Sequence, residues 1–252
     1  MLLAYILGFS LLGSLASLVG ALVIVVFPRV FKRFRLRFLA FALGTMLGVT
    51  FLDVLPHALE VALPEPVLAT VLAAFLAFYL LERFLHGHHA HTPATEPDGA
   101  PLSRTAGTAV LVGDTVHNFV DGVVIAAAFL VSVPLGIMTA IATFAHEIPQ
   151  ELSDLMILIN SGFKPSQAIA VNFASGLASL AGGGLAYALR GALDPFLPYM
   201  LAVAAASFLY IAASNLDPVV QHDDGEAHGS PWQTVALLAG VAGVYAMHHL
   251  LE

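Results

Sequence analysis

The sequence predicts an all-α integral membrane protein with eight transmembrane helices, and three observations support this fold class. The 252 residues are 59% hydrophobic and only 10% charged, whereas about a quarter of the residues in a soluble domain are charged. Long apolar segments recur along the chain, and about 20 apolar residues are enough for one membrane span. Eight spans with short connections use nearly the whole length. We therefore expect residues 1–252 to form a single polytopic transmembrane domain.

The first three spans are expected at residues 2–27, 38–62 and 67–85. The first span is uncharged, and its small residues suit close helix packing. A cluster of basic residues separates the first two spans, and it contains five of the nine Lys and Arg residues: Arg29, Lys32, Arg33, Arg35 and Arg37. Because basic loops stay in the cytoplasm, this pattern places the N-terminus outside.

The other five spans are expected at residues 107–131, 135–159, 166–189, 196–216 and 232–251. A polar cytoplasmic loop, residues 86–106, precedes them and contains the run H-G-H-H-A-H. With this topology only Arg190 of the nine basic residues lies outside, as the positive-inside rule requires. The C-terminus is then also outside.

The fourth span carries a polar stripe in its middle. Asp114, His117 and Asp121 are spaced i, i+3 and i+7, so they share one face of a helix. Asn118 lies beside His117 and widens the stripe. All four side chains have nitrogen or oxygen atoms that can bind a metal ion.

The fifth and second spans carry similar patterns. In the fifth span, His146 and Gln150 are four residues apart, and a neighbouring stripe contains Glu147, Glu151 and Asp154. In the second span, Asp53 and His57 are also four residues apart. Spans 2, 4 and 5 therefore carry the metal-type ligands.

The carboxylates of spans 4 and 5 have no basic partner nearby in sequence, because no Lys or Arg lies between Arg104 and Lys164. A charged side chain at the bilayer centre costs about 2.5–3.5 kcal/mol on insertion scales. Bound cations or protons must therefore supply the positive charge. Imidazole, carboxylate and amide ligands together suit divalent first-row ions, and zinc is the foremost candidate.

Composition excludes other kinds of function. The chain has no cysteine, so thiolate zinc sites and thiol catalysis are excluded. Its net charge of −8 does not favour a nucleic-acid partner. The hydrophobic spans instead require a lipid bilayer.

Prolines are expected to interrupt spans 2 and 5. Pro56 lies between Asp53 and His57, and Pro149 lies inside the polar stripe of span 5. A third proline, Pro218, follows Asp217 at the end of span 7. A proline inside a helix leaves a carbonyl without its helical partner, and in a membrane such a carbonyl needs another partner or a wet cavity. The pattern favours a pathway over a solid bundle.

Several polar residues have structural interpretations as well. Asp53 and His57 fit either the pathway or an interhelix hydrogen bond. The H-G-H-H-A-H run and the segment with His222, Asp223, Asp224 and His228 fit either metal capture or a solvated linker. His248 and His249 suit an interfacial helix end, and the glycines at 182–184 suit helix packing.

The motifs H-N-F-V-D-G at 117–122 and H-E-I-P-Q-E at 146–151 resemble the paired signatures of the ZRT/IRT-like (ZIP) divalent metal transporters. The flanking G-D-T-V-H-N-F-V-D-G, E-L-S-D-L-M-I-L-I-N-S-G and L-P-H-A are similar to the LIV-1 branch of that family. The resemblance covers the whole eight-span layout.

This resemblance implies an eight-helix transporter that moves zinc or similar ions into the cytoplasm across the plasma or inner membrane. Its two-metal site would lie between spans 4 and 5. One metal ion would be bound by His117, Asp121, His146 and Gln150. Asn118 and Glu147 would lean toward the second ion, with Glu151 close by, while Asp53, His57, Asp114 and Asp154 would belong to the ion's pathway.

The chain departs from the LIV-1 pattern, which usually has His where this chain has Gln150 and often has His where it has Asp53. Because Gln is a weaker ligand than imidazole, iron, manganese and cadmium remain open beside zinc. The resemblance also implies a homodimer.

Two other functions compete with metal transport. A proton- or sodium-coupled carrier of another solute would explain the carboxylates but not the histidines gathered with them. An intramembrane metalloprotease would use an H-E-x-x-H motif, but the fifth residue here is Gln150 and Pro149 lies within the motif. We therefore expect no enzyme activity.

Overall fold

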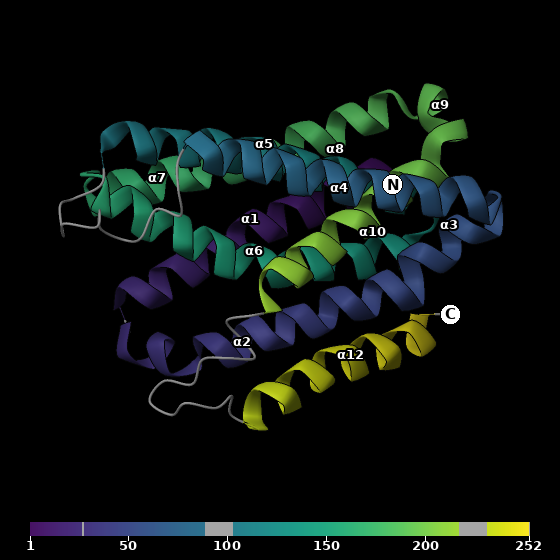
Figure 1. Ribbon diagram of the computed structural model, residues 1–252. Coiled ribbons are helices and arrows are strands. Elements are labelled where there is room, and N and C mark those ends of the chain that lie inside the picture. The colour runs from purple at the N-terminus through teal and green to yellow at the C-terminus, as the bar shows by residue number, and fades with distance from the viewer. Residues whose placement is uncertain (27, 89–102, 217–230, 252) are drawn as a thin grey trace.

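The computed structural model describes residues 1–26, 28–88, 103–216 and 231–251, and these are almost entirely helical (Figure 1). In the described residues, eight helical rods follow one another at the places where the eight spans are expected. The first four consist of α1 (Leu2–Val26), then α2 (Pro28–Val49) with its extensions η1 (Thr50–Val54) and α3 (Leu55–Val61), then α4 (Pro64–His88), and then α5 (Arg104–Val131). The all-α membrane fold predicted from sequence is confirmed.

The other four rods complete the bundle. They are α6 (Val133–Asn160), the pair α7 (Pro165–Gly176) and α8 (Ala178–Ala188), the run of α9 (Arg190–Leu193), η2 (Asp194–Phe196) and α10 (Leu197–Ser214), and finally α12 (Pro231–Leu251). Figure 1 shows both chain ends at the same end of the molecule as α3 and α9. That both termini face the outside of a membrane stays a prediction.

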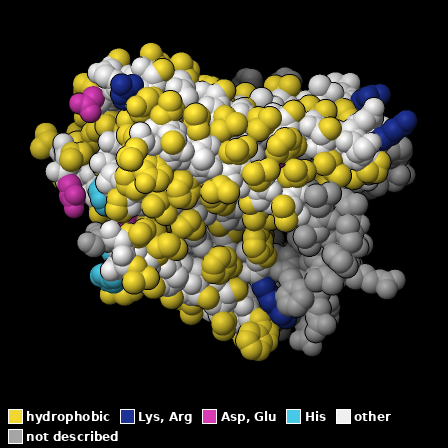
Figure 2. Space-filling view, turned by 180° about the vertical axis from the view of Figure 1, so that it is seen from behind, with side chains coloured by type: hydrophobic (Ala, Val, Ile, Leu, Met, Phe, Trp, Pro, Cys, Tyr) yellow, Lys and Arg dark blue, Asp and Glu magenta, His cyan; other side chains and the backbone are white. Residues whose placement is uncertain are grey.

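Six helical segments of the described chain are long and apolar enough to cross a membrane: 36–61, 64–81, 104–131, 165–188, 190–214 and 231–251. Leu2–Ala16 is a shorter apolar helix. Hydrophobic side chains cover the middle of the face seen in Figure 2, and the acidic and histidine side chains visible there lie at its left-hand end. An apolar belt between polar ends is the surface that a bilayer requires.

The proline interruptions expected in spans 2 and 5 need correction. The helical backbone of α6 continues through Pro149 without a break from Val133 to Asn160. In span 2 the irregularity precedes Pro56 and is a π-helical turn, η1, which contains Asp53. Packing against neighbouring helices allows proline to remain within a continuous membrane helix. Pro218 and Asp217 lie outside the described residues.

The helices pack as two groups. In the first, α5 lies against α6 and α8, and α1 packs on α6 and α8. In the second, α12 lies along α2, and α10 lies along α4 and α3. The groups meet mainly where α2 and α10 contact α6 and α5. We call them the α5/α6 bundle (α1, α5, α6, α7 and α8) and the α2/α12 bundle (α2, η1, α3, α4, α10 and α12).

Glycine permits the closest helix contact within each bundle. A Cβ on Gly122 of α5 would collide with the Ser179 carbonyl of α8, and one on Gly182 of α8 would collide with the Phe119 carbonyl. Between α2 and α12, Gly44 and Gly240 approach the facing backbone in the same way. Because side chains at these positions would force the helices apart, each pair is held at backbone contact.

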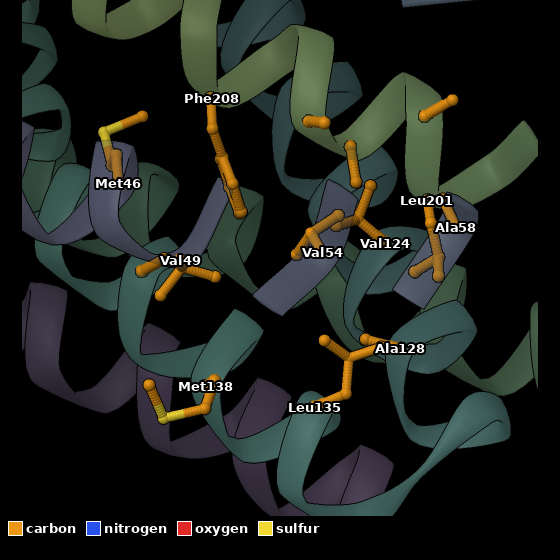
Figure 3. Close-up of a cluster of buried hydrophobic side chains, with 14 of the residues drawn as sticks. Met46, Val49, Val54, Ala58, Val124, Ala128, Leu135, Met138, Leu201 and Phe208 are labelled. Atoms are coloured by element: carbon orange, nitrogen blue, oxygen red, sulfur yellow. The ribbon is translucent and has the colours of Figure 1, made fainter. Parts of the chain in front are cut away.

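A buried hydrophobic cluster fills the space between the bundles toward the end that carries α3 (Figure 3). It joins residues of α2, η1 and α3 to residues of α5, α6, α10 and α12. Val49, Val54, Val124, Met138 and Phe208 are among its members, and each is at most 5% exposed. Between this end and the middle of the molecule, the two bundles therefore meet through apolar packing.

Candidate metal centre

Helices α5 and α6 carry the two main polar stripes and run antiparallel to each other. A single residue, Ser132, connects them, and its side chain accepts a hydrogen bond from the Leu135 amide at 3.2 Å. This bond caps the start of α6. Because the connection is so short, the middle of α5 lies opposite the middle of α6, and the two stripes face each other.

Four side chains from these stripes form a cluster, which we call the metal centre: His117, Asp121, His146 and Glu147. One potential ligand atom from each lies within 4.8 Å of all the others. The His146 Nε2 atom is 3.1 Å from Asp121 Oδ2 and 3.2 Å from His117 Nε2. The His117 Nε2 atom is 3.6 Å from Asp121 Oδ2 and 3.8 Å from Glu147 Oε1.

These separations match the spacing that a tetrahedral metal ion requires. Zinc binds imidazole nitrogen and carboxylate oxygen at about 2.0–2.2 Å, so two of its ligand atoms lie about 3.3–3.6 Å apart. Four of the six separations among the ligand atoms, 3.1–3.8 Å, lie around this value, and the other two are at most 4.8 Å. Small side-chain rotations would complete the tetrahedron.

The orientation of His146 also suits a ligand. Its Nδ1 atom lies 3.2 Å from the Ala142 carbonyl oxygen, and a carbonyl can only accept a hydrogen bond. In the neutral ring Nδ1 must therefore carry the proton, which leaves a lone pair on Nε2 facing the other three residues. Metal-binding histidines commonly have their second nitrogen held in this way.

Burial makes a positive charge necessary at this position. Asp121 is 2% exposed and Glu147 is 4% exposed, and Glu147 Oε1 makes no hydrogen bond within the protein. No lysine or arginine in the described part of the chain forms an ion pair with either carboxylate. A buried charge is costly unless it is paired or bound to a metal ion. The donor set therefore fits a divalent cation.

A second group of polar side chains adjoins the metal centre, one helical turn toward the N-terminus of α5 and one turn toward the C-terminus of α6. We call it the oxygen group: Asp114, Asn118, Gln150 and Glu151. The Asn118 amide donates to Asp114 Oδ1 at 3.0 Å. Gln150 also lies within hydrogen-bonding reach of Asp114, and Asn118 within that of Glu151. Amide and carboxylate oxygens are hard ligands, so this group could bind a divalent ion with weaker preference for zinc.

Helix α7 covers the oxygen group. Ser175 donates a hydrogen bond to the Asp114 carboxylate, and the Asn172 amide donates to the Glu151 carbonyl at 3.2 Å. Both residues are buried. Asp154, one turn beyond Glu151, is half-buried and within electrostatic reach of Asp114. The polar residues therefore continue from the metal centre toward the end of α6 that precedes Lys164.

The predicted ligand sets stay predictions. The resemblance places Gln150 with His117, Asp121 and His146, and in the structure Gln150 also lies within hydrogen-bonding reach of Asp114. The resemblance places Glu147 toward the second ion, and in the structure Glu147 belongs to the four-residue cluster. Because consecutive residues of a helix point about 100° apart, the rotation of α6 about its own axis sets how these side chains are divided.

Asp53 and His57 lie apart from the metal centre, in η1 and α3. The His57 Nδ1 atom is 2.8 Å from the Asp53 carbonyl oxygen, so the contact between these two residues is made by the Asp53 backbone. The Asp53 carboxylate instead meets His248 of α12, with 2.7 Å between Oδ1 and Nδ1. His248, interpreted from sequence as an interfacial helix end, thus also makes a contact between helices. Sequence gives no signal for a contact across 195 positions.

Other predicted histidine sites lie outside the described residues. The H-G-H-H-A-H run begins at the end of α4, and its part beyond His88 falls in the undescribed range 89–102. The segment with His222, Asp223, Asp224 and His228 falls in the range 217–230.

Hydroxyl groups from α1 and α8 also reach the site. A cavity of about 10 Å³ adjoins the metal centre and is lined by Ser10, Ser14, Thr143, Ser179, Asn118, Asp121 and Glu147, among others. Such a cavity holds about one water molecule. The sequence interpretation treated the small residues of span 1 only as packing residues, but Ser10 and Ser14 share one helix face at spacing i, i+4, and that spacing could have indicated a polar contact.

Comparison with known proteins places these motifs in a family. The family model for the ZIP zinc transporter matches residues 94–248. The chain is 31% identical to the mouse zinc transporter ZIP13, and this match covers 92% of the chain and 78% of ZIP13. It is 36% identical to human zinc transporter ZIP10 over 56% of the chain and 18% of ZIP10. It is 38% identical to human zinc transporter ZIP4 over 48% of the chain and 18% of ZIP4. The chain thus spans most of ZIP13 but less than a fifth of the longer ZIP10 and ZIP4.

Proposed function

Because the chain belongs to the ZIP family of zinc transporters, we propose that it carries divalent metal ions, zinc foremost, across a membrane into the cytoplasm. The resemblance to the LIV-1 branch noted in the sequence agrees with the similarity to ZIP13, ZIP10 and ZIP4. The observation that carries the proposal is the spacing of His117, Asp121, His146 and Glu147, whose ligand atoms lie within 4.8 Å of one another in a buried site. The ion is cargo, so the same site must release it.

Zinc suits the metal centre better than iron or manganese. Two of its four ligands are imidazoles, which zinc favours, whereas manganese favours carboxylate and carbonyl oxygen. Gln150, the residue that raised the question of harder ions, contacts Asp114 in the oxygen group. The substitution of Gln for His at this position therefore bears on a second ion more than on the first.

The oxygen group provides the second half of a two-metal site. Asp114 and Glu151 supply two carboxylates, and Asn118 and Gln150 supply amide oxygens. In this arrangement an ion leaving the metal centre meets ligands one turn toward the N-terminus of α5 and the C-terminus of α6, and Asp154 lies one turn beyond these on α6. Because successive ligands along this path bind the ion less tightly than the metal centre does, the ion can leave the site and move on.

The packing of the two bundles supports the proposed inward direction of transport. The hydrophobic cluster closes the space between them toward α3 and the C-terminal end of α12. His117, by contrast, retains 24% exposure of its side chain, and the polar side chains continue toward Lys164. The polar side chains thus lead toward the side that the positive-inside rule assigns to the cytoplasm, which supports inward transport. Movement of the α5/α6 bundle against the α2/α12 bundle would open the other side. We place the protein in the plasma or inner membrane, with both termini outside.

The metalloprotease alternative does not fit the geometry. A protease of the H-E-x-x-H type uses its glutamate as a general base and its second histidine as a ligand. Here Glu147 is itself a member of the ligand cluster, and the second histidine position is Gln150. We infer transport without enzyme activity. A homodimer, implied by the resemblance, stays a prediction.

Uptake into liposomes tests the proposal. Liposomes with the purified protein should accumulate radioactive zinc, and His117→Ala should abolish this accumulation. His249→Ala, which changes an exposed histidine on α12, is the matched control and should transport normally. Unchanged uptake by the His117→Ala protein would overturn the site, and uptake of another solute without metal dependence would favour the proton- or sodium-coupled carrier.

A further inference from the structure

The small cavity beside the metal centre is lined by hydroxyl groups that lie deep inside the α5/α6 bundle. Ser10 of α1 and Thr143 of α6 are among its lining residues, together with Asp121 and Glu147 of the metal centre. Ser10 is 1% exposed and Thr143 is 3% exposed, so solvent outside the protein does not reach either hydroxyl. Buried polar groups almost always have a hydrogen-bond partner, either in the protein or in an ordered water molecule.

The Thr143 hydroxyl differs from most other threonine hydroxyls in the described helices. Five of these donate a hydrogen bond to the carbonyl oxygen four residues earlier, at 2.7–3.0 Å: Thr45, Thr50, Thr70, Thr108 and Thr115. Thr143 Oγ1 and Ser10 Oγ, by contrast, make no hydrogen bond with any described part of the protein. Each of these two hydroxyls therefore has a proton for which the protein supplies no acceptor.

The other two hydroxyls that line the cavity have acceptors already. Ser14 Oγ and Ser179 Oγ each lie 2.8 Å from the Gly176 carbonyl oxygen and donate to it. A hydroxyl has a single proton to donate. Among the hydroxyls of the cavity, only those of Ser10 and Thr143 therefore remain as free donors.

Two carboxylate oxygens from residues that line the same cavity are also without a partner. Asp121 Oδ2 and Glu147 Oε1 accept no hydrogen bond from the described residues. The His146 Nε2 atom is 3.1 Å from Asp121 Oδ2, but its proton is on Nδ1, which faces the Ala142 carbonyl. The cavity thus brings together two free donors and two free acceptors.

We propose that one water molecule occupies this cavity and links Ser10 and Thr143 to the carboxylates of the metal centre. A water molecule accepts two hydrogen bonds and donates two, so it gives a partner to both hydroxyls and to both carboxylate oxygens. The cavity volume of about 10 Å³ suits a single water molecule. Ser10 and Thr143 are then positioning residues for Asp121 and Glu147. This inference rests on the proposed function, which identifies these carboxylates as ligands of the transported ion.

The proposed water molecule orients the carboxylates without competing with the ion. A carboxylate oxygen has two lone pairs, so it can accept a hydrogen bond from water and still bind a cation. Carboxylates that bind metal ions are commonly held by hydrogen bonds of this kind, and loss of such a partner lowers metal affinity about 10–100-fold. Helix α1 would therefore contribute to zinc affinity through Ser10, although it provides no ligand.

Zinc affinity of Thr143 variants tests this role. Thr143→Val removes the hydroxyl and keeps the shape of the side chain, so zinc affinity measured by calorimetry on the purified protein should fall about 10-fold. Thr143→Ser keeps the hydroxyl and should restore most of the affinity. Thr139→Val is the matched control, because Thr139 is a buried residue of the same helix whose hydroxyl also has no partner but does not line the cavity. Equal affinities of Thr143→Val and Thr139→Val would overturn the proposal.

A variant on a different helix tests whether the two hydroxyls hold the same water molecule. Ser10→Ala should also lower zinc affinity about 10-fold, and it provides the test if Thr143→Val does not fold. The loss in the double variant should be smaller than the product of the two single losses, because the effects of residues that share a partner are not additive. A double loss equal to that product would contradict a shared water molecule.

A crystal structure of the metal-free protein shows the water molecule directly. We expect a density peak about 2.5–3.0 Å from both Ser10 Oγ and Thr143 Oγ1. The peak should be absent in Thr143→Val and present in Thr139→Val. No peak in a map that resolves other buried water molecules would overturn the proposal, and so would a peak with the anomalous signal of a metal ion.

These measurements separate failure of this inference from failure of the proposed function. If His117→Ala leaves zinc uptake unchanged, the proposed function is wrong. If His117→Ala abolishes uptake but Thr143→Val and Ser10→Ala bind zinc as tightly as the original protein, only the water-mediated positioning is wrong.

Discussion

The Nε2 atoms of His117 and His146 lie 3.2 Å apart, although the two residues are 29 positions apart and belong to different helices. The His146 Nδ1 atom faces the Ala142 carbonyl, so its Nε2 lone pair points toward His117. Two lone pairs at this distance repel each other unless a proton or a cation lies between them. The carboxylates of Asp121 and Glu147 complete the same cluster, which favours a cation.

Removing one ligand of the metal centre should abolish tight zinc binding. Asp121→Asn retains the size of the side chain but removes a negative charge from a residue that is 2% exposed. We expect zinc affinity to fall on the order of 100-fold. Titration calorimetry of the purified protein measures this change, with Asp194→Asn in the exposed η2 as the control. Equal affinities of the two variants would exclude Asp121 as a ligand.

Gln150 should matter less than the four residues of the metal centre. Because it contacts Asp114 in the oxygen group, Gln150→Ala should reduce the rate of uptake but leave zinc affinity of the metal centre nearly unchanged. His146→Ala should abolish both. Parallel measurements of uptake and of zinc affinity check this difference. Loss of affinity in Gln150→Ala as large as in His146→Ala would restore Gln150 to the first metal ion.

Acid should weaken zinc uptake. A free imidazole gains a proton near about pH 6.5, and a protonated imidazole cannot bind metal. Uptake should therefore be constant at higher pH and should fall as the medium is acidified, because protons then compete with the metal ion for the imidazole ligands. Initial rates of uptake between pH 5 and 8 at fixed zinc concentration test this dependence. A flat profile would contradict imidazole ligation of the transported ion.

The stability of the protein should depend on the close packing of α5 on α8. Gly122→Ala places a methyl group against the Ser179 carbonyl, and such overpacking costs about 1–3 kcal/mol. The thermal unfolding temperature in detergent should therefore fall. Gly113→Ala, on the same helix with nothing within 4 Å of the added Cβ, should leave it unchanged or raise it, because Ala is the better helix former. Equal lowering by both substitutions would contradict the packing argument.

The helical architecture could be predicted from sequence because membrane helices are recognisable as long apolar segments. The start of α6 was expected at residue 135 and lies at Val133, and the start of α12 was expected at 232 and lies at Pro231. The residues of the metal centre were also among the predicted ligands, since helical spacing places His117 on the same face as Asp121. Their role as ligands stays a prediction.

The division of residues between the two halves of the site depends on tertiary structure. The rotation of α6 about its axis sets whether Glu147 or Gln150 faces His117, and no local pattern fixes that rotation. The contact of His248 with Asp53 depends on how α12 docks on α2. Proline was misleading for α6, because packing against neighbouring helices keeps the helix continuous through Pro149.

Anomalous scattering from crystals soaked with zinc tests the central claim most directly. We predict a zinc peak about 2.0–2.2 Å from Nε2 of His117 and His146 and from carboxylate oxygens of Asp121 and Glu147. A peak bound by Gln150 in place of Glu147, or no peak between α5 and α6, would contradict this account.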